Sequence, residues 1–151
     1  VKNKIKVGDF SNPSIEKIIS LKPDYIFCTG LEQARVIAQL RELNFKVYVA
    51  DPASFAELFK SIKEIGEITK KTAKALSLIG EMQARIDEVV SQVKFIPQEK
   101  RVKVFIEIWH EPLMTARKNT FVGELITLAG GDNIAREIER PYSKKNKNKV
   151  R

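Results

Sequence analysis

The feature that most constrains the fold is a regular alternation of short apolar runs and amphipathic stretches along residues 1–66. The run at 24–28 has no polar alternation, which is typical of a strand covered on both faces. Predicted strands cover residues 5–7, 24–28 and 46–50, and predicted helices cover residues 14–22, 34–44 and 55–66. Strands and helices that alternate through short connections favour a parallel α/β sheet with right-handed crossovers.

The first predicted helix carries a carboxylate that faces water. Pro13 and Ser14 favour the start of this helix, and Pro23 ends it at Lys22. One face of the helix is formed by Ile15, Ile18 and Ile19. Glu16 therefore points to solvent in the first turn, where the helix dipole favours its charge. An exposed acid on a short rigid helix suits docking better than catalysis.

A longer helical pattern follows the alternating region. Ser54 and Glu57 match a capping box for helix 55–66, and Gly66 is the expected end of that helix. Apolar residues then recur every three to four positions from about residue 69 to 93, which predicts one helix of roughly 37 Å. Gly80 interrupts it at a cost of about 1 kcal/mol. We expect this helix to run across a domain boundary, because it is longer than a usual crossover helix.

The pattern after Pro97 predicts the start of a second α/β unit. Residues 101–108 read as one strand with apolar residues at alternate positions, and Thr120 caps a helix that Gly130 and Gly131 end. The expected buried face of this helix consists of Phe121, Leu125, Leu128 and Ala129. No apolar run that would form a partner strand follows. We therefore expect the second unit to be incomplete.

The net charge of +8 is concentrated at the C-terminal end. Residues 136–151 contain seven Lys or Arg and two Glu, which is about +5 of the total. This segment has few apolar side chains, so we expect it to be disordered unless an anionic partner binds it. Since the basic residues form a tail and not a patch on the fold, nucleic acid is not an expected partner.

The remaining composition narrows the class of protein. A single cysteine, Cys28, excludes an internal disulfide and a cysteine-based zinc cluster, and its place at the end of an apolar strand predicts a buried, inert thiol. Frequent Lys, Glu and Ile are typical of a thermophilic source. No apolar run reaches the roughly 20 residues that cross a bilayer, and no secretory leader is recognisable in this sequence.

Trp109 and His110 follow the predicted strand at its carboxyl end, where open α/β sheets bind ligands. These side chains suit stacking against a flat or conjugated ligand, and Arg117 and Lys118 follow closely with cationic groups. The alternative is that Trp109 is a core aromatic and His110 a surface loop residue. Both interpretations stay open on local evidence.

Catalysis is not expected. His110 is the only histidine, no nucleophile elbow lies near it, and one imidazole is too little for a typical zinc site. Gly130 and Gly131 follow a helix, so they are interpreted as helix capping and not as a phosphate loop. Thr29 and Gly30 lack a Walker lysine, yet they follow the strand at 24–28 and are placed to line a ligand cleft.

Several stretches of the chain together resemble the substrate-binding proteins of ABC importers for iron siderophores, haem and cobalamin. In that family, one long helix joins two α/β lobes. The matching stretches are residues 12–18 (Asn-Pro-Ser-Ile-Glu-Lys-Ile) with 21–24 (Leu-Lys-Pro-Asp), the strand and helix that follow up to Val49, the long helix, and residues 112–134, from Pro-Leu-Met-Thr through Gly-Gly-Asp-Asn-Ile. The resemblance covers nearly all of residues 5–143.

The resemblance implies a domain order and a set of roles. It implies an N-terminal α/β lobe at 1–66 without its first strand and helix, an interlobe helix at 67–96, and the start of a second lobe at 97–135. Glu16 matches a glutamate that docks with the membrane permease. The implied ligand-binding residues are Thr29, Gly30, Leu31, Trp109, His110, Arg117 and Tyr142. The cargo would be a metal chelate, with no resident cofactor or protein-bound metal, and the location would be periplasmic or extracytoplasmic.

Two departures from the family pattern leave alternatives open. The first elements of one lobe and most of the other have no counterpart here, and neither does the second docking glutamate. Such a pattern fits a truncated gene, a frameshift or a piece of a longer protein. Unpaired strand edges predict self-association by strand exchange. A different class, a stand-alone α/β interaction module whose basic tail binds an acidic partner, is the alternative function.

Overall fold

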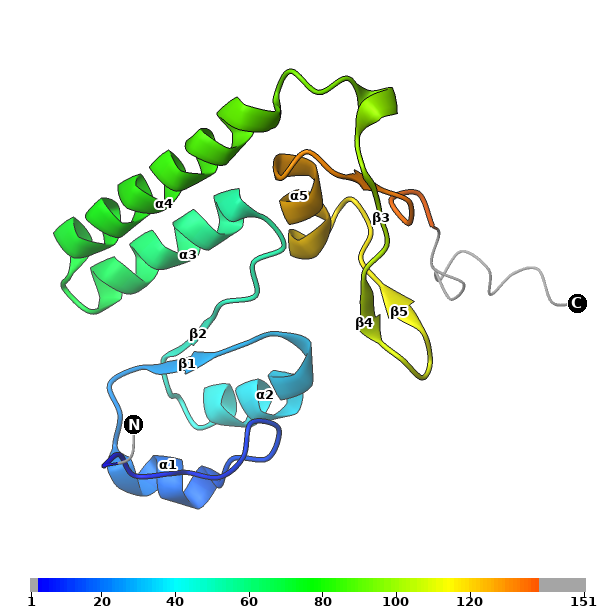
Figure 1. The fold of residues 1–151 in the computed structure, drawn as a ribbon. Helices are drawn as coiled ribbons and strands as arrows, with labels where there is room; N and C mark the ends of the chain where they lie inside the picture. The colour runs from blue at the N-terminus through cyan, green and yellow to red at the C-terminus, as the bar shows by residue number, and fades with distance from the viewer. Residues whose placement is uncertain (1–2, 139–151) are drawn as a thin grey trace, which may run out of the picture. The chain divides into compact units, whose positions relative to one another are not determined.

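The computed structural model describes residues 3–138 and divides the chain into two compact units, Val1–Asp51 (unit 1) and Pro52–Arg151 (unit 2) (Figure 1). Helices alternate with short, mostly parallel strand pairs, so the predicted mixed α/β class is confirmed. Among the described residues, no helix combines the length and the apolar character that a membrane span requires.

Unit 1 consists of two helices and a parallel pair of strands. Its elements are α1 (Ile15–Leu21), β1 (Ile26–Cys28), the 3-10 turn η1 (Leu31–Gln33), α2 (Ala34–Glu42) and β2 (Val47–Val49). β1 and β2 pair in parallel, with Ile26 opposite Val47 and Cys28 opposite Val49. The core of the unit contains Ile18, Cys28, Ile37 and Leu40, of which Leu40 is fully buried.

Helix α1 begins and ends near the predicted residues. The Ser14 hydroxyl accepts a hydrogen bond from the Lys17 N–H, and Lys22 ends the helix in the left-handed region at φ 46°, just before Pro23. Pro13 precedes the cap and is not in the helix. The predicted apolar face is only partly right, because Ile18 is buried whereas Ile19 is 41% exposed.

Two strand predictions in unit 1 were wrong. Residues 5–7 form no strand; the neighbouring backbone makes a single bridge between Gly8 and Pro13, and Ile5 is exposed. β1 is not covered on both faces within the described residues, because the Phe27 ring is 46% exposed. A pair of strands with two helices has too few elements to cover both faces.

Unit 2 begins with a helical hairpin and ends with short strands around one helix (Figure 1). Its elements are α3 (Phe55–Ile68), α4 (Thr72–Val93), the 3-10 turn η2 (Gln98–Lys100), β3 (Lys103–Val104), β4 (Glu107–Trp109), β5 (Met114–Thr115), α5 (Phe121–Leu128) and β6 (Asp132–Asn133). The predicted long helix corresponds to α4, whose 22 residues span about 33 Å.

The sequence predicted that Gly66 ends α3, but the helix continues to Ile68. Gly66 is buried inside the helix, and a Cβ atom there would lie 2.5 Å from the Cβ of Ala75 in α4. Gly66 therefore permits close approach of the two helices. The predicted capping box is partly confirmed: the Ser54 hydroxyl accepts from the Glu57 N–H, but the Glu57 carboxylate accepts from the Ala53 N–H and not from that of Ser54.

The first residue of α3, Phe55, contacts α5, which is part of unit 2. The Phe55 N–H donates to the Glu124 carboxylate of α5 at 2.7 Å, and the Phe55 and Phe121 rings lie 4.8 Å apart. The compact units accordingly divide after Asp51, whereas the sequence grouped residues 55–66 with the first lobe. The lobe boundaries of the whole family fold stay a prediction.

The predicted strand 101–108 is in fact two strands. β3 pairs in parallel with β6, and β4 pairs with β5 as an antiparallel hairpin. No apolar run forms the partner strand, as predicted; β6, which pairs with β3, has a polar sequence that apolar patterning cannot detect. Asn133 is 4% exposed; its amide donates to the Ala116 carbonyl and its side-chain oxygen accepts from the Ala135 N–H, both at 2.9 Å.

Helix α5 is capped as predicted but buries a different face. The Thr120 hydroxyl accepts from the Gly123 N–H, and Gly130 ends the segment at φ 78°. The buried positions within the helix are Gly123 and Ile126, whereas Leu125 is 42% exposed. Gly131 allows close packing, because a Cβ atom there would lie 2.8 Å from Ile126.

Candidate functional site

The loop after β1, residues 29–31, lies at the carboxyl end of the parallel strand pair of unit 1. The Gln33 side chain holds this loop: its oxygen accepts from the Thr29 N–H at 2.9 Å, and its amide donates to the Phe10 carbonyl at 2.7 Å. The Gln33 N–H also donates to the Gly30 carbonyl at 3.2 Å. Three hydrogen bonds through one residue thus fix the loop predicted to contact ligand.

Asp51 lies against the same loop. The register of β1 and β2 places the residues after Cys28 beside those after Val49, and the Ala50 N–H donates to the Cys28 carbonyl at 2.9 Å. A Cβ atom on Gly30 would lie 1.9 Å from the Asp51 Oδ2 atom. Gly30 is therefore the residue that lets this carboxylate lie on the loop.

Sequence reasoning missed Gln33 and Asp51. Both are polar residues close to a predicted strand end, Gln33 in the turn after β1 and Asp51 two residues after β2. This proximity was the available signal, because loops at the carboxyl ends of parallel strands share one edge of the sheet. The side-chain contacts themselves follow no sequence pattern.

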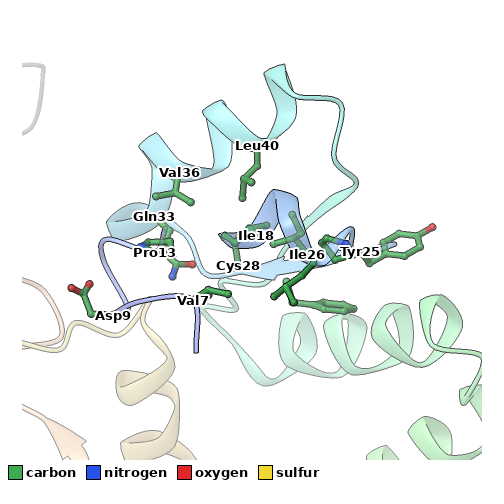
Figure 2. A pocket seen from close by; sticks show the side chains of 13 residues that line it. Val7, Asp9, Pro13, Ile18, Tyr25, Ile26, Cys28, Gln33, Val36 and Leu40 are labelled. Carbon is green, nitrogen blue, oxygen red and sulfur yellow. The ribbon is translucent and has the colours of Figure 1, made fainter. Parts of the chain in front are cut away.

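An apolar hollow of about 420 Å³ also lies in unit 1 (Figure 2). Its lining consists of Val7, Asp9, Pro13, Ile18, Leu21, Pro23, Tyr25, Ile26, Phe27, Cys28, Gln33, Val36 and Leu40. None of the predicted ligand residues between positions 3 and 138 lines it, and several of its lining residues form the core of unit 1. Cys28 is buried here. Burial raises the pKa of its thiol by more than the charge of Arg41 lowers it, so the pKa is raised overall, which supports the predicted inert thiol.

Trp109 lies at the end of β4, in a hairpin of unit 2. Its indole N–H donates to the Glu111 carbonyl at 2.8 Å, and it pairs across the hairpin with Met114. The side chain is 62% exposed, so the alternative that Trp109 is a core aromatic is wrong. An oriented indole with an open ring face is suited to stacking on a flat ligand.

His110 lies beside Trp109 but is engaged by a neighbour. Its Nδ1 atom lies 3.1 Å from the Glu107 carboxylate, and its side chain is 89% exposed. Within residues 3–138, no three or more His, Cys, Asp or Glu side chains are grouped closely enough to hold a metal ion. The arrangement offers a polar edge to the hairpin.

Arg117 is held through its backbone at the turn before α5. Its carbonyl accepts from the Thr120 hydroxyl at 2.7 Å and packs against Gly123, where a Cβ atom would lie 1.9 Å from that oxygen. The neighbouring Lys118 pairs with Glu137 at 2.9 Å. In the part of the chain that the structure describes, no hydrogen bond or ion pair joins Arg117 to the hairpin residues.

The predicted docking residue, Glu16, lies on α1 in unit 1. Glu16 is exposed on α1; its own N–H and the Ser14 hydroxyl, at 3.0 Å, donate to the carboxylate and hold its pKa below the ordinary value. It is thus ionised at neutral pH. Tyr142 lies outside the described residues. Thr29, Gly30 and Leu31 are contiguous in unit 1, whereas Trp109, His110 and Arg117 belong to unit 2.

Comparison with known proteins gives a consistent picture. Residues 1–148 match the family described as periplasmic binding protein. An uncharacterized ABC transporter substrate-binding lipoprotein of Bacillus subtilis (strain 168), YvrC, is 35% identical over 89% of this chain and 44% of its own length. The high-affinity heme uptake system protein IsdE of Staphylococcus aureus (strain bovine RF122 / ET3-1) is 25% identical over 93% of this chain and 48% of its own.

A solved structure shares the fold. The crystal structure of a possible iron-binding (periplasmic solute-binding) protein from Staphylococcus epidermidis superposes with a TM-score of 0.72 at 26% identity, and the match covers 91% of this chain and 55% of that one. The chain thus spans about half the length of the relatives that it matches. Since the family match extends over nearly the whole sequence, the chain belongs to the periplasmic binding protein family.

Proposed function

We propose that this chain is the substrate-binding component, or a part of it, of an ABC importer for a ferric chelate, haem or cobalamin. The observation that carries the proposal is the family match over residues 1–148. Two features support it: the loop at 29–31, which Gln33 fixes through the Thr29 N–H, and the exposed Trp109. The names of the relatives, which refer to heme uptake and to iron binding, support this class of cargo.

We propose that the chain binds its cargo and does not transform it. The relatives are named as binding, uptake or substrate-binding proteins. The only histidine of the sequence is paired with Glu107 on an exposed hairpin, and the sequence around it contains no nucleophile elbow. We also propose that the ligand brings its own metal and that the protein supplies aromatic and polar contacts.

Titration of the full chain tests the proposal directly. Haemin, ferric desferrioxamine and cyanocobalamin are each added while calorimetry measures binding heat and the fluorescence of Trp109, the only tryptophan, is followed. One ligand should bind and quench the indole fluorescence.

Trp109→Ala should weaken the binding of that ligand about five- to tenfold, because stacking on an aromatic ring contributes about 1 kcal/mol or more. Phe95→Ala is the matched control, because Phe95 is also exposed, at 78%, but lies outside the hairpin. Absence of binding to all three ligands would refute the proposal.

We propose that Glu16 contacts the membrane permease from outside the cytoplasm. The relatives are named as periplasmic or lipoprotein substrate-binding proteins, which supports this location. Glu16 is exposed and ionised, so it is available to a cationic partner. In co-sedimentation with proteoliposomes that contain the importer's permease, Glu16→Lys should reduce binding at least tenfold, whereas Glu81→Lys, an exposed charge reversal on α4, should not. Equal binding by both variants would contradict this role.

We also propose that the chain self-associates through β3. Among the described strands, β3 pairs only with β6, and the neighbouring Val102 is 74% exposed. Light scattering at micromolar concentration should report a dimer or larger species, and Val102→Glu should shift it toward monomer. Lys103→Glu is the control: it changes the charge at an adjacent exposed residue but removes no apolar side chain, so it should affect self-association less than Val102→Glu. A monomeric wild-type chain would overturn this proposal.

A further inference from the structure

The Asp51 carboxylate forms part of the surface of loop 29–31. It reaches this position because β2 ends beside β1 and because Gly30 has no side chain: a Cβ atom on Gly30 would lie 1.9 Å from Oδ2 and 2.6 Å from Cγ of Asp51. Any other residue at position 30 would displace the carboxylate. Gly30 and Asp51 therefore form one structural pair.

The charge of Asp51 is not balanced within the described residues. Its side chain is exposed, and none of the ion pairs found between residues 3 and 138 includes it. Asp9 in the same unit offers a contrast, because its carboxylate accepts from the N–H groups of Ser11 and Asn12 at 2.9 and 2.7 Å. The Asp9 carboxylate thus stabilises the local turn, whereas the Asp51 carboxylate can still accept hydrogen bonds from a ligand.

The neighbouring loop leaves that capacity available. The Thr29 N–H donates to Gln33, so the loop is held without using Asp51. A carboxylate that is not required for the local fold is free to accept hydrogen bonds from a ligand. It favours N–H or O–H donors, and cations most strongly, and it repels carboxylates.

We infer that Asp51 is a specificity-determining residue: it selects ligands that present a hydrogen-bond donor, best a cationic one, to loop 29–31, and it disfavours ligands that present a carboxylate there. Gly30 is its positioning residue. The inference rests on the proposed function, because it assumes that this loop contacts the cargo. It narrows that function by giving the site a preferred ligand charge.

A pair of probes that differ by one charge tests the inference. Ferric desferrioxamine carries a free ammonium group, and its N-acetylated form keeps the same iron-binding groups without it. The full wild-type chain should bind the ammonium form about two- to fivefold more tightly, which corresponds to an exposed ion pair. Asp51→Asn should remove this preference. Glu42→Gln, at an exposed carboxylate near the end of α2, is the matched control and should retain it.

The role of Gly30 is tested by a double-mutant cycle. Gly30→Ala should reduce the preference as Asp51→Asn does, and the two changes together should have no further effect, because both act through the same carboxylate. A substitution that acted only by perturbing the fold would weaken the binding of both desferrioxamine forms equally. Additive effects on the preference would overturn the pairing of Gly30 with Asp51.

Haemin and cyanocobalamin complete the experiment. Haemin carries two carboxylates, so if the chain binds haemin, Asp51→Asn should tighten that binding about two- to fivefold. An unchanged haemin affinity, or equal wild-type affinity for the two desferrioxamine forms, would overturn the inference and leave the proposed function standing. If cyanocobalamin alone binds, its amide N–H groups are the donors, so Asp51→Asn should weaken its binding, and an unchanged affinity would overturn the inference. Binding of none of these compounds would overturn both.

Discussion

In unit 1 the candidate ligand-binding loop is fixed by residues from other parts of the sequence, whereas in unit 2 the hydrogen bond of the candidate aromatic side chain stays within its own hairpin. Gln33 accepts from the Thr29 N–H and donates to the carbonyl of Phe10, which lies 23 residues before Gln33, and Asp51 lies on Gly30. Trp109, in contrast, donates to Glu111 two residues later and remains 62% exposed. The first region is preorganised by tertiary contacts, and the second offers an adaptable apolar surface.

This difference has a consequence for stability. A loop that depends on tertiary contacts is sensitive to the core beneath it, whereas a local hairpin is less so. Substitutions in the core of each unit should therefore affect the two regions unequally.

The largest expected effect is at Leu40, which is fully buried in unit 1. Leu40→Ala should lower the free energy of unfolding by about 2–5 kcal/mol, because it leaves a cavity. Chemical denaturation measures the loss, and labelling of Cys28 reports the opening of unit 1. Leu43→Ala is the control, since Leu43 is 48% exposed and should cost about 1 kcal/mol or less. Similar losses in both variants would contradict the assigned core.

A second test concerns the buried polar residue of unit 2. Asn133→Ala should cost about 1–3 kcal/mol, because the Ala116 carbonyl and the Ala135 N–H lose their hydrogen-bond partner in a buried setting. Urea denaturation followed by circular dichroism measures it. Asn119→Ala, at an exposed position, should change stability by less than about 0.5 kcal/mol. A neutral Asn133→Ala would show that β6 does not depend on this side chain.

Two glycines of the helical hairpin should respond with opposite signs. Gly80→Ala should stabilise the chain by about 0.5–1 kcal/mol, because a Cβ atom there meets nothing within 4 Å and alanine favours the helix. Gly66→Ala should destabilise it, since its Cβ would lie 2.5 Å from that of Ala75. Thermal unfolding decides both. The same sign for both changes would refute the packing of α3 on α4.

The smallest effect is expected at Glu16. Its pKa is lowered in the folded state, so its ionised form contributes stability above the ordinary glutamate pKa of about 4.3, and this contribution is lost as pH falls through the lowered value. Wild type should thus be slightly more stable than Glu16→Gln at pH 7, and the difference should shrink as the pH falls through the lowered pKa of Glu16. Thermal unfolding at both pH values measures the difference. A difference that grew as the pH fell would contradict the hydrogen bonds assigned to Glu16.

Much of the fold was predictable because caps and apolar periodicity act locally. Ser14, Ser54 and Thr120 cap helices as their sequence positions suggested, and the 22-residue α4 was visible as a long apolar stripe. β6 was not predictable in the same way. Its pairing depends on Asn133, whose amide replaces the apolar contacts that strand patterns detect.

The candidate site was predictable only in part. Strand ends pointed to Thr29, Gly30 and Trp109, because ligand loops follow the carboxyl ends of parallel strands. Gln33 and Asp51 were missed, since their contacts depend on the register of β1 and β2 and on the turn after β1. The roles of the predicted residues in ligand binding stay predictions.

We propose, for each unit by itself, that the cargo contacts the loop at 29–31 in unit 1 and the hairpin at Trp109 in unit 2. Hydrogen exchange of the full chain, measured with and without saturating haemin, ferric desferrioxamine or cyanocobalamin in turn, tests it most directly. For the ligand that binds, we expect slower exchange of the backbone amides at residues 29–31 and 109–110, with little change in α4. Unchanged exchange at either region in the presence of every ligand would contradict the account.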